Sequence, residues 1–407
     1  MTAGAVSVVI VSRGRPNDLR RCLTALRYQT RRHFEVVVVT DPASMAALRA
    51  DPLFPGLKAV EFDEANISAA RNIGIDHAAG EILAFLDDDA IAEPPWLDRL
   101  VAPFATHDIA ATAGWVRSTN GFDYRWRGDW ILPWGELRAF VSDGVQVFGP
   151  EAPHPVLTIG ANCAFRRAAL VAIGGFDPNF RIGLDDADVN MRLTRAGQRM
   201  AIVAAAQVHH IPAAGPYRNA RRVPLTLEQG GASFGWWFTK YARPEHEFAP
   251  IRRFMRDTVL ANRIRRGHLD AATADRLAEG FARGFAEGRG RAPVPVSFAP
   301  VPPAFHPFPT LAVPPQHTVL SGRPWSRHRL FAEAAARAAQ GEVVTVLILS
   351  PTALYHQRRY HDQGFWTQQG GLFGRSRRSD PLLRWYRFSA RVARESADLA
   401  PMRLPRG

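Results

Sequence analysis

Three consecutive carboxylates follow an apolar segment of strand length, and they are the residues best suited to chemistry. The segment 82–86 reads Ile-Leu-Ala-Phe-Leu, and Asp87, Asp88 and Asp89 come directly after it. Such apolar runs are typical of central strands in α/β sheets, whose ligands bind beyond the carboxyl ends of the strands. Because adjacent acids repel one another, we expect a hard divalent cation to share the site. The triplet is equally consistent with an acidic turn that caps the next helix.

Strand and helix patterns that precede the triplet bring further polar groups to strand ends. Residues 6–11 form a β-branched run, residues 12–18 a loop, and leucines at 19, 23 and 26 recur at helical spacing. A second strand at 34–39 leads to Asp41, which can accept hydrogen bonds from a nucleobase or ribose, or form a turn before Pro42. Arg71 lies in a helical segment, and its planar fork of donors suits phosphate, although many arginines of this chain are ordinary surface residues.

These segments, taken in order, resemble the inverting family 2 glycosyltransferases. The resemblance begins with residues 8–16 (Val-Val-Ile-Val-Ser-Arg-Gly-Arg-Pro), Asp41, residues 70–74 (Ala-Arg-Asn-Ile-Gly) and residues 79–89 (Ala-Gly-Glu-Ile-Leu-Ala-Phe-Leu-Asp-Asp-Asp). It continues with residues 160–167 (Gly-Ala-Asn-Cys-Ala-Phe-Arg-Arg), 174–177 (Gly-Gly-Phe-Asp), 184–188 (Leu-Asp-Asp-Ala-Asp) and 208–210 (Val-His-His). Each motif alone is weak, but the ordered set is specific and covers about residues 5–245.

The resemblance implies the nucleotide-diphosphosugar transferase fold called GT-A, a three-layer α/β/α sandwich around a mixed, mostly parallel sheet. We expect a GT-A domain at 1–245, a basic helical segment at 246–291, a Pro-rich linker or extended wrap at 292–315, and a small α/β extension at 316–407. In the extension, a helix is predicted at about 326–340, a strand at 342–349, then a Gly- and aromatic-rich loop and a basic helix at about 381–396. One β-α unit is too small to stand alone, so this region is expected to pack on the first domain.

The resemblance also implies a donor site. Asp41 resembles the acid that binds the nucleobase, and Arg71 resembles the residue that contacts the diphosphate. Asp87 and Asp89 resemble the two ends of a DxD motif, which ties ribose and metal to the donor diphosphate. The complete set of residues implied to bind the donor is Ser12, Arg13, Asp41, Arg71, Asp87, Asp88, Asn162 and Asp185.

A catalytic base and metal ligands follow from the same resemblance. Asp186 resembles the general base, and Asp89 with His209 or His210 resembles the ligands of Mg²⁺ or Mn²⁺; the doublet leaves open which histidine is used. Two simpler explanations remain open. Asp185 or Asp186 caps the helix that follows, or the histidines are buried and hydrogen-bonded within the core.

The chemistry of sugar transfer fits these residue types. Inversion is one in-line displacement at the anomeric carbon, which requires a base on the acceptor side and neutralisation of charge on the leaving nucleoside diphosphate. A carboxylate in a partly dry cleft can have its pKa raised enough to act as the base. Residues 115–158 contain four tryptophans with arginines between them, which suits acceptor recognition, although at least half of these tryptophans are expected in the core.

Composition narrows the class of protein. The formal charge is +13, almost all of it from arginine, but no nucleic-acid-binding motif accompanies it, so no nucleic acid partner is expected. Residues 243–291 read as a basic helical stretch, which either lies on an anionic membrane surface or packs on the catalytic domain. Two cysteines do not form a disulfide framework, and no signal peptide or membrane-spanning segment is apparent. A cytoplasmic location is expected, with the protein either free or bound peripherally to the inner face of the membrane.

The sequence therefore predicts a hexosyltransferase that is inverting and metal-dependent. Its donor would be a UDP-, GDP- or dTDP-sugar and its acceptor a glycan, a lipid-linked molecule or a small molecule, as in the synthesis of cell-envelope or extracellular polysaccharide. The alternatives are a non-catalytic binding module that retains the fold, and a nucleotidyltransferase. A nucleotidyltransferase would normally show a Gly-rich basic loop after the first strand, whereas residues 12–15 contain a single glycine.

Overall fold

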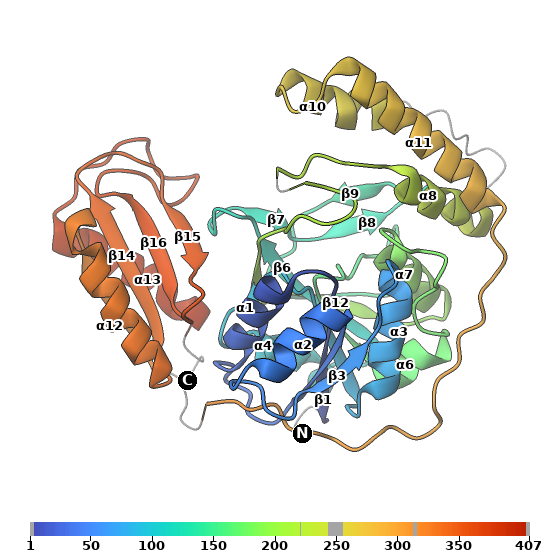
Figure 1. Cartoon of the computed structure of the whole chain (residues 1–407), viewed down its shortest axis with the longest axis horizontal. Coiled ribbons are helices and arrows are strands. Elements are labelled where there is room, and N and C mark those ends of the chain that lie inside the picture. Colours follow the sequence, from blue (N-terminus) through green and yellow to red (C-terminus); the bar gives the residue numbers. More distant parts are fainter. Residues whose placement is uncertain (1–3, 220, 243–254, 312–315, 404–407) are drawn as a thin grey trace.

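The computed structural model describes residues 4–219, 221–242, 255–311 and 316–403, which form two β-sheet units of very different size (Figure 1). The larger sheet has the order β10-β12-β6-β11-β4-β1-β2-β3, with β5 paired to β12 and β7 to β6. Its strands are β1 (Val6–Ser12), β2 (Glu35–Thr40), β3 (Lys58–Glu61), β4 (Ile82–Leu86), β5 (Ala90–Ala92), β6 (Ala111–Arg117), β7 (Tyr124–Trp126), β10 (Val145–Phe148), β11 (Asn162–Arg166) and β12 (Met200–His210). A separate hairpin joins β8 (Asp129–Ile131) to β9 (Leu137–Ala139).

The larger sheet is mixed, with most strands in one direction. The strands β1, β2, β3 and β4 are mutually parallel, β11 is antiparallel to both β4 and β6, and β12 is parallel to β6. The central strands are mostly apolar and almost entirely buried, as expected for strands covered on both faces. The helices of this domain are α1 (Pro16–Leu26), α2 (Pro42–Ala50), α3 (Ile67–His77), α4 (Trp96–Val101), α5 (Pro103–Thr106), α6 (Arg167–Ala172) and α7 (Asp185–Arg195). The predicted three-layer α/β fold is confirmed.

The strand order fixes where a ligand can bind. The chain runs from β1 outward to β2 and β3 and then returns to β4 on the other side of β1. Right-handed crossovers therefore place α1 and α2 on one face of the sheet and α3 on the opposite face. Ligands of open α/β sheets bind in the crevice where the order reverses, outside the carboxyl ends of the strands. In this chain that position lies at the ends of β1 and β4.

A helical pair follows the sheet, and it shows how the later part of the basic stretch packs. The helices are α8 (Glu228–Tyr241), the π-helix η1 (Met255–Leu260), α10 (Ala261–Arg265) and α11 (Ala271–Arg289); residues 243–254 of the predicted stretch lie outside the described residues. Figure 1 shows α11 lying along α8. A Cβ on Gly284 would stand 1.8 Å from the carbonyl oxygen of Glu228, so the two backbones touch. Leu277 and Phe281 are buried in this contact, so the apolar face of α11 packs on the protein rather than on a membrane.

The Pro-rich segment is an extended wrap along the first domain. It contains no helix or strand within 292–311, and Figure 1 shows it passing below the larger sheet. The backbone amide of Phe308 donates to the carbonyl of Phe34, and that of His306 donates to the carboxylate of Glu35 at 3.0 Å. Proline lacks an amide donor and holds an extended backbone, which suits a segment fixed by occasional hydrogen bonds.

The C-terminal unit is larger than one β-α unit. Its sheet has the order β13-β14-β16-β15, and two helices pack on it. The elements are β13 (His317–Gly322), the 3-10 helix η2 (Pro324–Ser326), α12 (Arg327–Ala339), β14 (Val343–Ser350), β15 (Gln357–Tyr360), β16 (Trp366–Gly371) and α13 (Phe388–Arg403). The helix predicted at about 326–340 and the strand predicted at 342–349 are confirmed, and the basic helix begins later than predicted, at Phe388. The prediction of a Gly- and aromatic-rich loop was wrong in part, because that segment contains β15 and β16. Short polar strands such as Gln-Arg-Arg-Tyr carry little hydrophobic periodicity.

Candidate functional site

The carboxylates that follow β4 meet a histidine from the end of β12. Asp87, Asp89 and His210 each offer a ligand atom, and these atoms lie within 4.8 Å of one another. The Nε2 atom of His210 is 2.8 Å from Oδ1 of Asp89 and 3.7 Å from Oδ2 of Asp87. Asp89 and His210 are buried and Asp87 is half-buried, so the group lies just beneath the surface.

The surroundings of Asp88 and Asp89 shift their pKa values in opposite directions. Burial raises the pKa of Asp88 to about 8, even though Arg15 lies 3.2 Å away and the Ser12 hydroxyl donates to it at 2.6 Å. Burial alone would also raise the pKa of Asp89, but His210, the backbone amide of Ala213 and Arg15 together lower it to about 2. Asp89 is therefore ionised at neutral pH, whereas burial favours the protonated form of Asp88.

The arrangement fits a divalent cation. Both ring nitrogens of His210 are buried, and the contact of Nε2 with Asp89 at 2.8 Å is an ion-pair distance without the geometry of a regular hydrogen bond among the described residues. Buried polar atoms are normally satisfied, so an unsatisfied imidazole nitrogen between two carboxylates suits a metal ligand. Two carboxylate oxygens and one imidazole are ligands that Mn²⁺ and Mg²⁺ accept.

A cavity of about 290 Å³ lies against the carboxylates at the ends of β1 and β4. Larger cavities exist, one of about 520 Å³ within the C-terminal unit and one of about 520 Å³ between that unit and the larger domain, but neither is lined by this acidic group. Five of the residues predicted to bind the donor or the metal line the smaller cavity: Ser12, Arg13, Asp87, Asp88 and Asp89. Arginines that were not predicted line it as well, namely Arg15, Arg181 and Arg218. The cavity thus combines acidic groups for a cation with several guanidinium groups for an anion.

Arg71 connects this cavity to the acidic pair at the start of α7. Its buried guanidinium pairs with Asp185, lies 3.5 Å from Asp87, and donates to the carbonyl of Gly160 at 3.2 Å. Burial alone would lower its pKa, but Asp185 and Asp87 raise it, so the charge is permanent. In this structure Arg71 bridges two carboxylates, and any contact with a diphosphate stays a prediction.

Asp186 lies in the first turn of α7, and the residue is half-buried. The amide of Gly160 donates to its Oδ2 at 3.1 Å, and the amide of Ala187 lies 2.8 Å from its Oδ1. Burial raises the pKa of Asp186, and the two amides only partly oppose this. Its neighbour Asp185 is buried and pairs with Arg71, so the two acids have different surroundings. Asp186 is the member of the pair that is free of a charged partner among the described residues.

The structure separates the two adjacent histidines, because successive side chains of a strand point to opposite faces. His210 faces the carboxylates, whereas His209 Nε2 lies 2.8 Å from Glu93 on the other side. Arg403 pairs with the same Glu93 at 3.1 Å, and the His209 ring contacts Trp366 with centroids 4.5 Å apart. His209 therefore belongs to a buried contact with the C-terminal unit, and of the two histidines only His210 lies in the group that could hold a metal ion.

Two predicted donor-binding residues already have protein partners. Asn162 is fully buried; its amide nitrogen donates to the carbonyls of Trp115 and Ala206, and its oxygen accepts from Trp96. Asp41 caps α2 by accepting from Ser44, and it also accepts the amide of Gly14 at 2.6 Å. Neither residue lines the 290 Å³ cavity. Their ligand roles stay predictions, and the alternative of a turn before Pro42 describes Asp41 better.

Sequence reasoning missed the arginines that pair with the carboxylates. Arg15 lies 3.0 Å from Asp89, and Arg218 lies 3.7 Å from the same carboxylate. Arg15 was within a quoted motif, and its place between the first strand and the first helix was a usable signal. Arg218 comes from the loop after β12, whose path cannot be inferred from periodicity.

Comparison with known proteins finds similar sequences and similar folds. A model of the family "Glycosyl transferase family 2" matches residues 7–174, which therefore form a family 2 glycosyltransferase domain. The O-antigen biosynthesis protein RfbC of Myxococcus xanthus is 29% identical over 241 residues, which are 54% of this chain and 18% of that protein. The glucosyl-dolichyl phosphate glucuronosyltransferase of Haloferax volcanii is 27% identical over 218 residues, 50% of this chain and 68% of that protein. A crystal structure of GalNAc-T7 with UDP, GalNAc and Mn²⁺ aligns at a TM-score of 0.43 and 20% identity, covering 63% of this chain and 54% of that one.

Proposed function

Starting from the family 2 glycosyltransferase domain at residues 7–174, we propose that the protein is an inverting, metal-dependent hexosyltransferase. It moves a sugar from a nucleotide diphosphosugar to a glycan or lipid-linked acceptor in polysaccharide or glycolipid synthesis. The observation that carries this proposal is the meeting of Asp87, Asp89 and His210 beside a cavity at the carboxyl ends of β1 and β4. A binding module without turnover would not need a separate free carboxylate such as Asp186.

The donor side is built from opposite charges. Asp87, Asp89 and His210 would hold Mn²⁺ or Mg²⁺, which when bound neutralises the charge that develops on the leaving diphosphate. Arg13 and Arg15 line the same cavity and can donate to phosphate oxygens. We place the nucleoside diphosphate in this cavity with its phosphates between the carboxylates and the arginines. The base of the nucleotide stays open.

The acceptor side is built around Asp186. The network from Asp87 through Arg71 to Gly160 holds Asp186 in a fixed position relative to the donor cavity. Asp186 accepts the proton of the acceptor hydroxyl as that oxygen attacks the anomeric carbon, and the bond to the nucleoside diphosphate breaks on the opposite side. Because burial raises the pKa of Asp186, its carboxylate is a stronger base than an exposed aspartate.

A thermal-shift screen with UDP, GDP, CDP and dTDP, each with and without Mn²⁺, tests the donor assignment. A specific nucleotide at about 100 times its Kd stabilises by about 2.7 kcal/mol, which corresponds to several degrees in Tm. We expect one nucleotide to stabilise only when Mn²⁺ is present. Its sugar conjugate should then be turned over to an inverted product in an acceptor screen. Stabilisation without any turnover favours the binding module, and release of pyrophosphate favours the nucleotidyltransferase.

The pH dependence of turnover should report Asp186. The ionised form of Asp186 is the base, so kcat is expected to fall as the pH is lowered through its pKa. Because burial raises that pKa, the acid limb should lie above the ordinary aspartate value of about 3.9. Steady-state rates at saturating donor across a pH series measure the limb, and thermal shifts at the same pH values report donor binding. An acid limb at the ordinary aspartate value, with binding intact, would contradict the assignment.

A further inference from the structure

Exposed apolar side chains gather at one edge of the C-terminal sheet. The strands β13, β14 and β16 are parallel, so the segments that follow them leave from the same edge. Five of the twelve exposed large apolar residues among the described ones lie in these segments, and we call them the apolar tip: Trp325, Leu354, Leu382, Leu383 and Trp385. The two tryptophans are 79% and 76% exposed. Scattered exposed apolar residues are ordinary, but a cluster marks an interaction surface.

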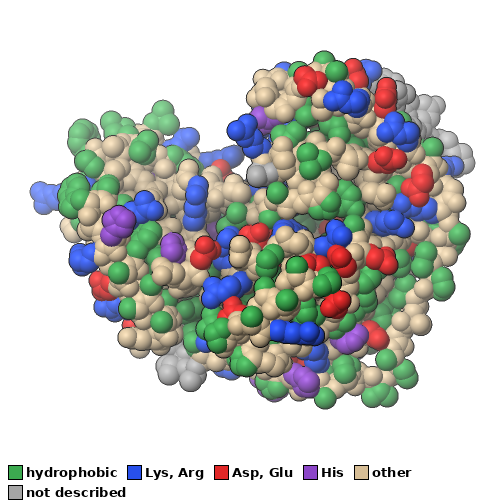
Figure 2. Space-filling view, viewed as in Figure 1, with side chains coloured by type: hydrophobic (Ala, Val, Ile, Leu, Met, Phe, Trp, Pro, Cys, Tyr) green, Lys and Arg blue, Asp and Glu red, His purple; other side chains and the backbone are tan. Residues whose placement is uncertain are grey.

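Contacts between the three segments hold the apolar tip together. The ring of Trp385 lies 4.6 Å from that of Phe373, just after β16, and the amide of Phe373 donates to the carbonyl of Thr352. The guanidinium of Arg323, two residues before Trp325, lies 4.7 Å from the centroid of the Phe388 ring. Figure 2 shows hydrophobic side chains at the top of the left-hand lobe, with Lys and Arg side chains beside them. The apolar tip is thus one surface rather than separate loop ends.

Arginines without acidic partners surround the apolar tip. None of four nearby arginines has a carboxylate in ion-pair range within the described part of the chain: Arg323, Arg327, Arg384 and Arg387. Segment 372–390 contains five arginines and a single acidic residue, Asp380. Arg323 and Arg384 instead lie over the rings of Phe388 and Tyr386. The surface therefore combines exposed aromatic and aliphatic groups with uncompensated positive charge.

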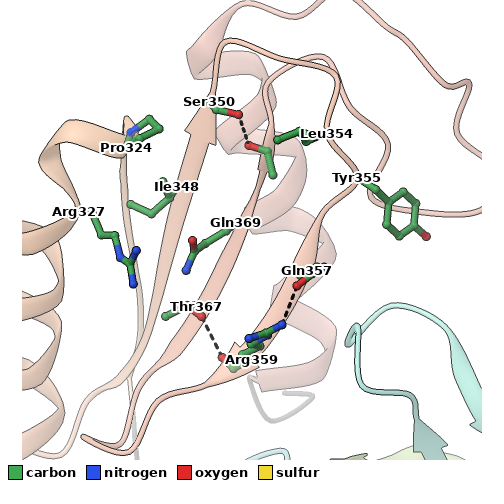
Figure 3. Close-up of a pocket in the computed structure, with 11 residues that line it drawn as sticks. Pro324, Arg327, Ile348, Ser350, Leu354, Tyr355, Gln357, Arg359, Thr367 and Gln369 are labelled. Carbon is green, nitrogen blue, oxygen red and sulfur yellow. Dashed lines mark hydrogen bonds between the residues drawn. The ribbon is translucent and has the colours of Figure 1, made fainter. Parts of the chain in front are cut away.

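A groove of about 520 Å³ opens beside the apolar tip and shares residues with it (Figure 3). Leu354 belongs to both, and Pro324, the neighbour of Trp325, lies at the rim. Arg327 from the start of α12 and Arg359 from β15 line opposite sides, with Gln369 of β16 between them. No Asp or Glu is among the lining residues. Two guanidinium groups around one amide suit an anion of phosphate size.

We propose that the C-terminal unit docks this protein on an anionic lipid bilayer. The apolar tip enters the interface, where tryptophan and leucine gain by burial, and the surrounding arginines face the charged headgroups. The groove takes the phosphate of one anionic headgroup between Arg327 and Arg359. Charge complementarity selects a bilayer over a second copy of the chain, since two copies would bring like-charged arginines together. No described helix has the length and apolarity needed to cross a bilayer, so docking of this kind is peripheral.

Vesicle co-sedimentation of the full chain tests the proposal. Wild type should bind vesicles that contain phosphatidylglycerol, bind vesicles of phosphatidylcholine much more weakly, and dissociate as salt is raised. The double variants Trp325→Ser with Trp385→Ser, and Arg327→Gln with Arg359→Gln, should each weaken binding by on the order of tenfold. The matched control is Val141→Ser with Val301→Ser, which removes exposed apolar groups outside the apolar tip and should bind as wild type.

Three results would overturn the proposal. Wild type could fail to bind anionic vesicles at low salt, or the tryptophan and arginine double variants could both bind as well as the control variant. The third is a dimer in lipid-free sedimentation that the tryptophan variant abolishes, since that would make the apolar tip an interface between two copies. The affected side chains are exposed, so the variants should keep the wild-type Tm, which a melting curve verifies.

Discussion

The Asp186→Asn variant is expected to lower kcat by on the order of 10³-fold while nucleotide binding with Mn²⁺ stays close to wild type. The amide keeps the shape of the carboxylate and can still accept from the Gly160 amide, which lies 3.1 Å away in the wild type. The amide cannot accept a proton from an acceptor hydroxyl, so only the rate of the chemical step should fall. Steady-state kinetics with a donor found in the nucleotide screen, together with thermal shifts, measure the two quantities separately.

The neighbouring variant Asp185→Asn is the comparison that makes this test informative. Asp185 is buried and pairs with Arg71, so its loss leaves a guanidinium with one carboxylate fewer inside the protein. Removal of one partner from a buried pair costs about 3–5 kcal/mol, so this variant should be less stable, with a lower Tm. If Asp185→Asn abolishes turnover at full stability and Asp186→Asn does not, the general base is Asp185 and the assignment made here is wrong.

The meeting of the acidic residues with the end of the first strand was predictable because strand ends converge. An apolar run that stops at Asp87, and a first strand that stops at Ser12, must meet at one edge when the strands are parallel neighbours. The pairing of β12 with β5 was not predictable in the same way. Its register sets His210 opposite Ala90 and His209 opposite Ile91, and this register decides which ring faces the carboxylates.

Other features depended on tertiary contacts that carry no local pattern. Asp41 was expected to meet a nucleobase, yet the loop that carries Gly14 folds back and supplies an amide donor to it. Glu93 forms its buried ion pair with Arg403, which is more than three hundred residues away in sequence. Such pairs are invisible to periodicity, which reports neighbours along one element only. The strands β13, β15 and β16 were missed because β13 is half-buried and because β15 and β16 are rich in polar residues or glycine, so that all three resemble loops in sequence.

The Asp89→Asn variant is expected to abolish the stabilisation that a nucleotide gives in the presence of Mn²⁺. Asp89 has a pKa of about 2, so it is charged at neutral pH, and its oxygens lie near His210, Arg15 and the amide of Ala213. A neutral amide offers one weak oxygen ligand in place of a carboxylate, and the metal affinity should fall by at least about 100-fold. Thermal shifts over a Mn²⁺ titration at saturating nucleotide measure this directly.

A matched control separates this loss from a general loss of negative charge. Asp362 forms an exposed ion pair with Arg21 at 2.7 Å, so Asp362→Asn removes the same charge at a distance from the cavity. Exposed pairs contribute little, about 0.2–1 kcal/mol, and the Mn²⁺ response of Asp362→Asn should match wild type.

Asp89 also stabilises the fold, because a carboxylate with a depressed pKa contributes stability that is lost as the pH falls through that value. The Asn variant should therefore have a lower Tm than wild type at neutral pH, and this difference should shrink as the pH approaches about 2. An unchanged Mn²⁺ response in Asp89→Asn would place the metal, and with it the donor diphosphate, elsewhere in the protein.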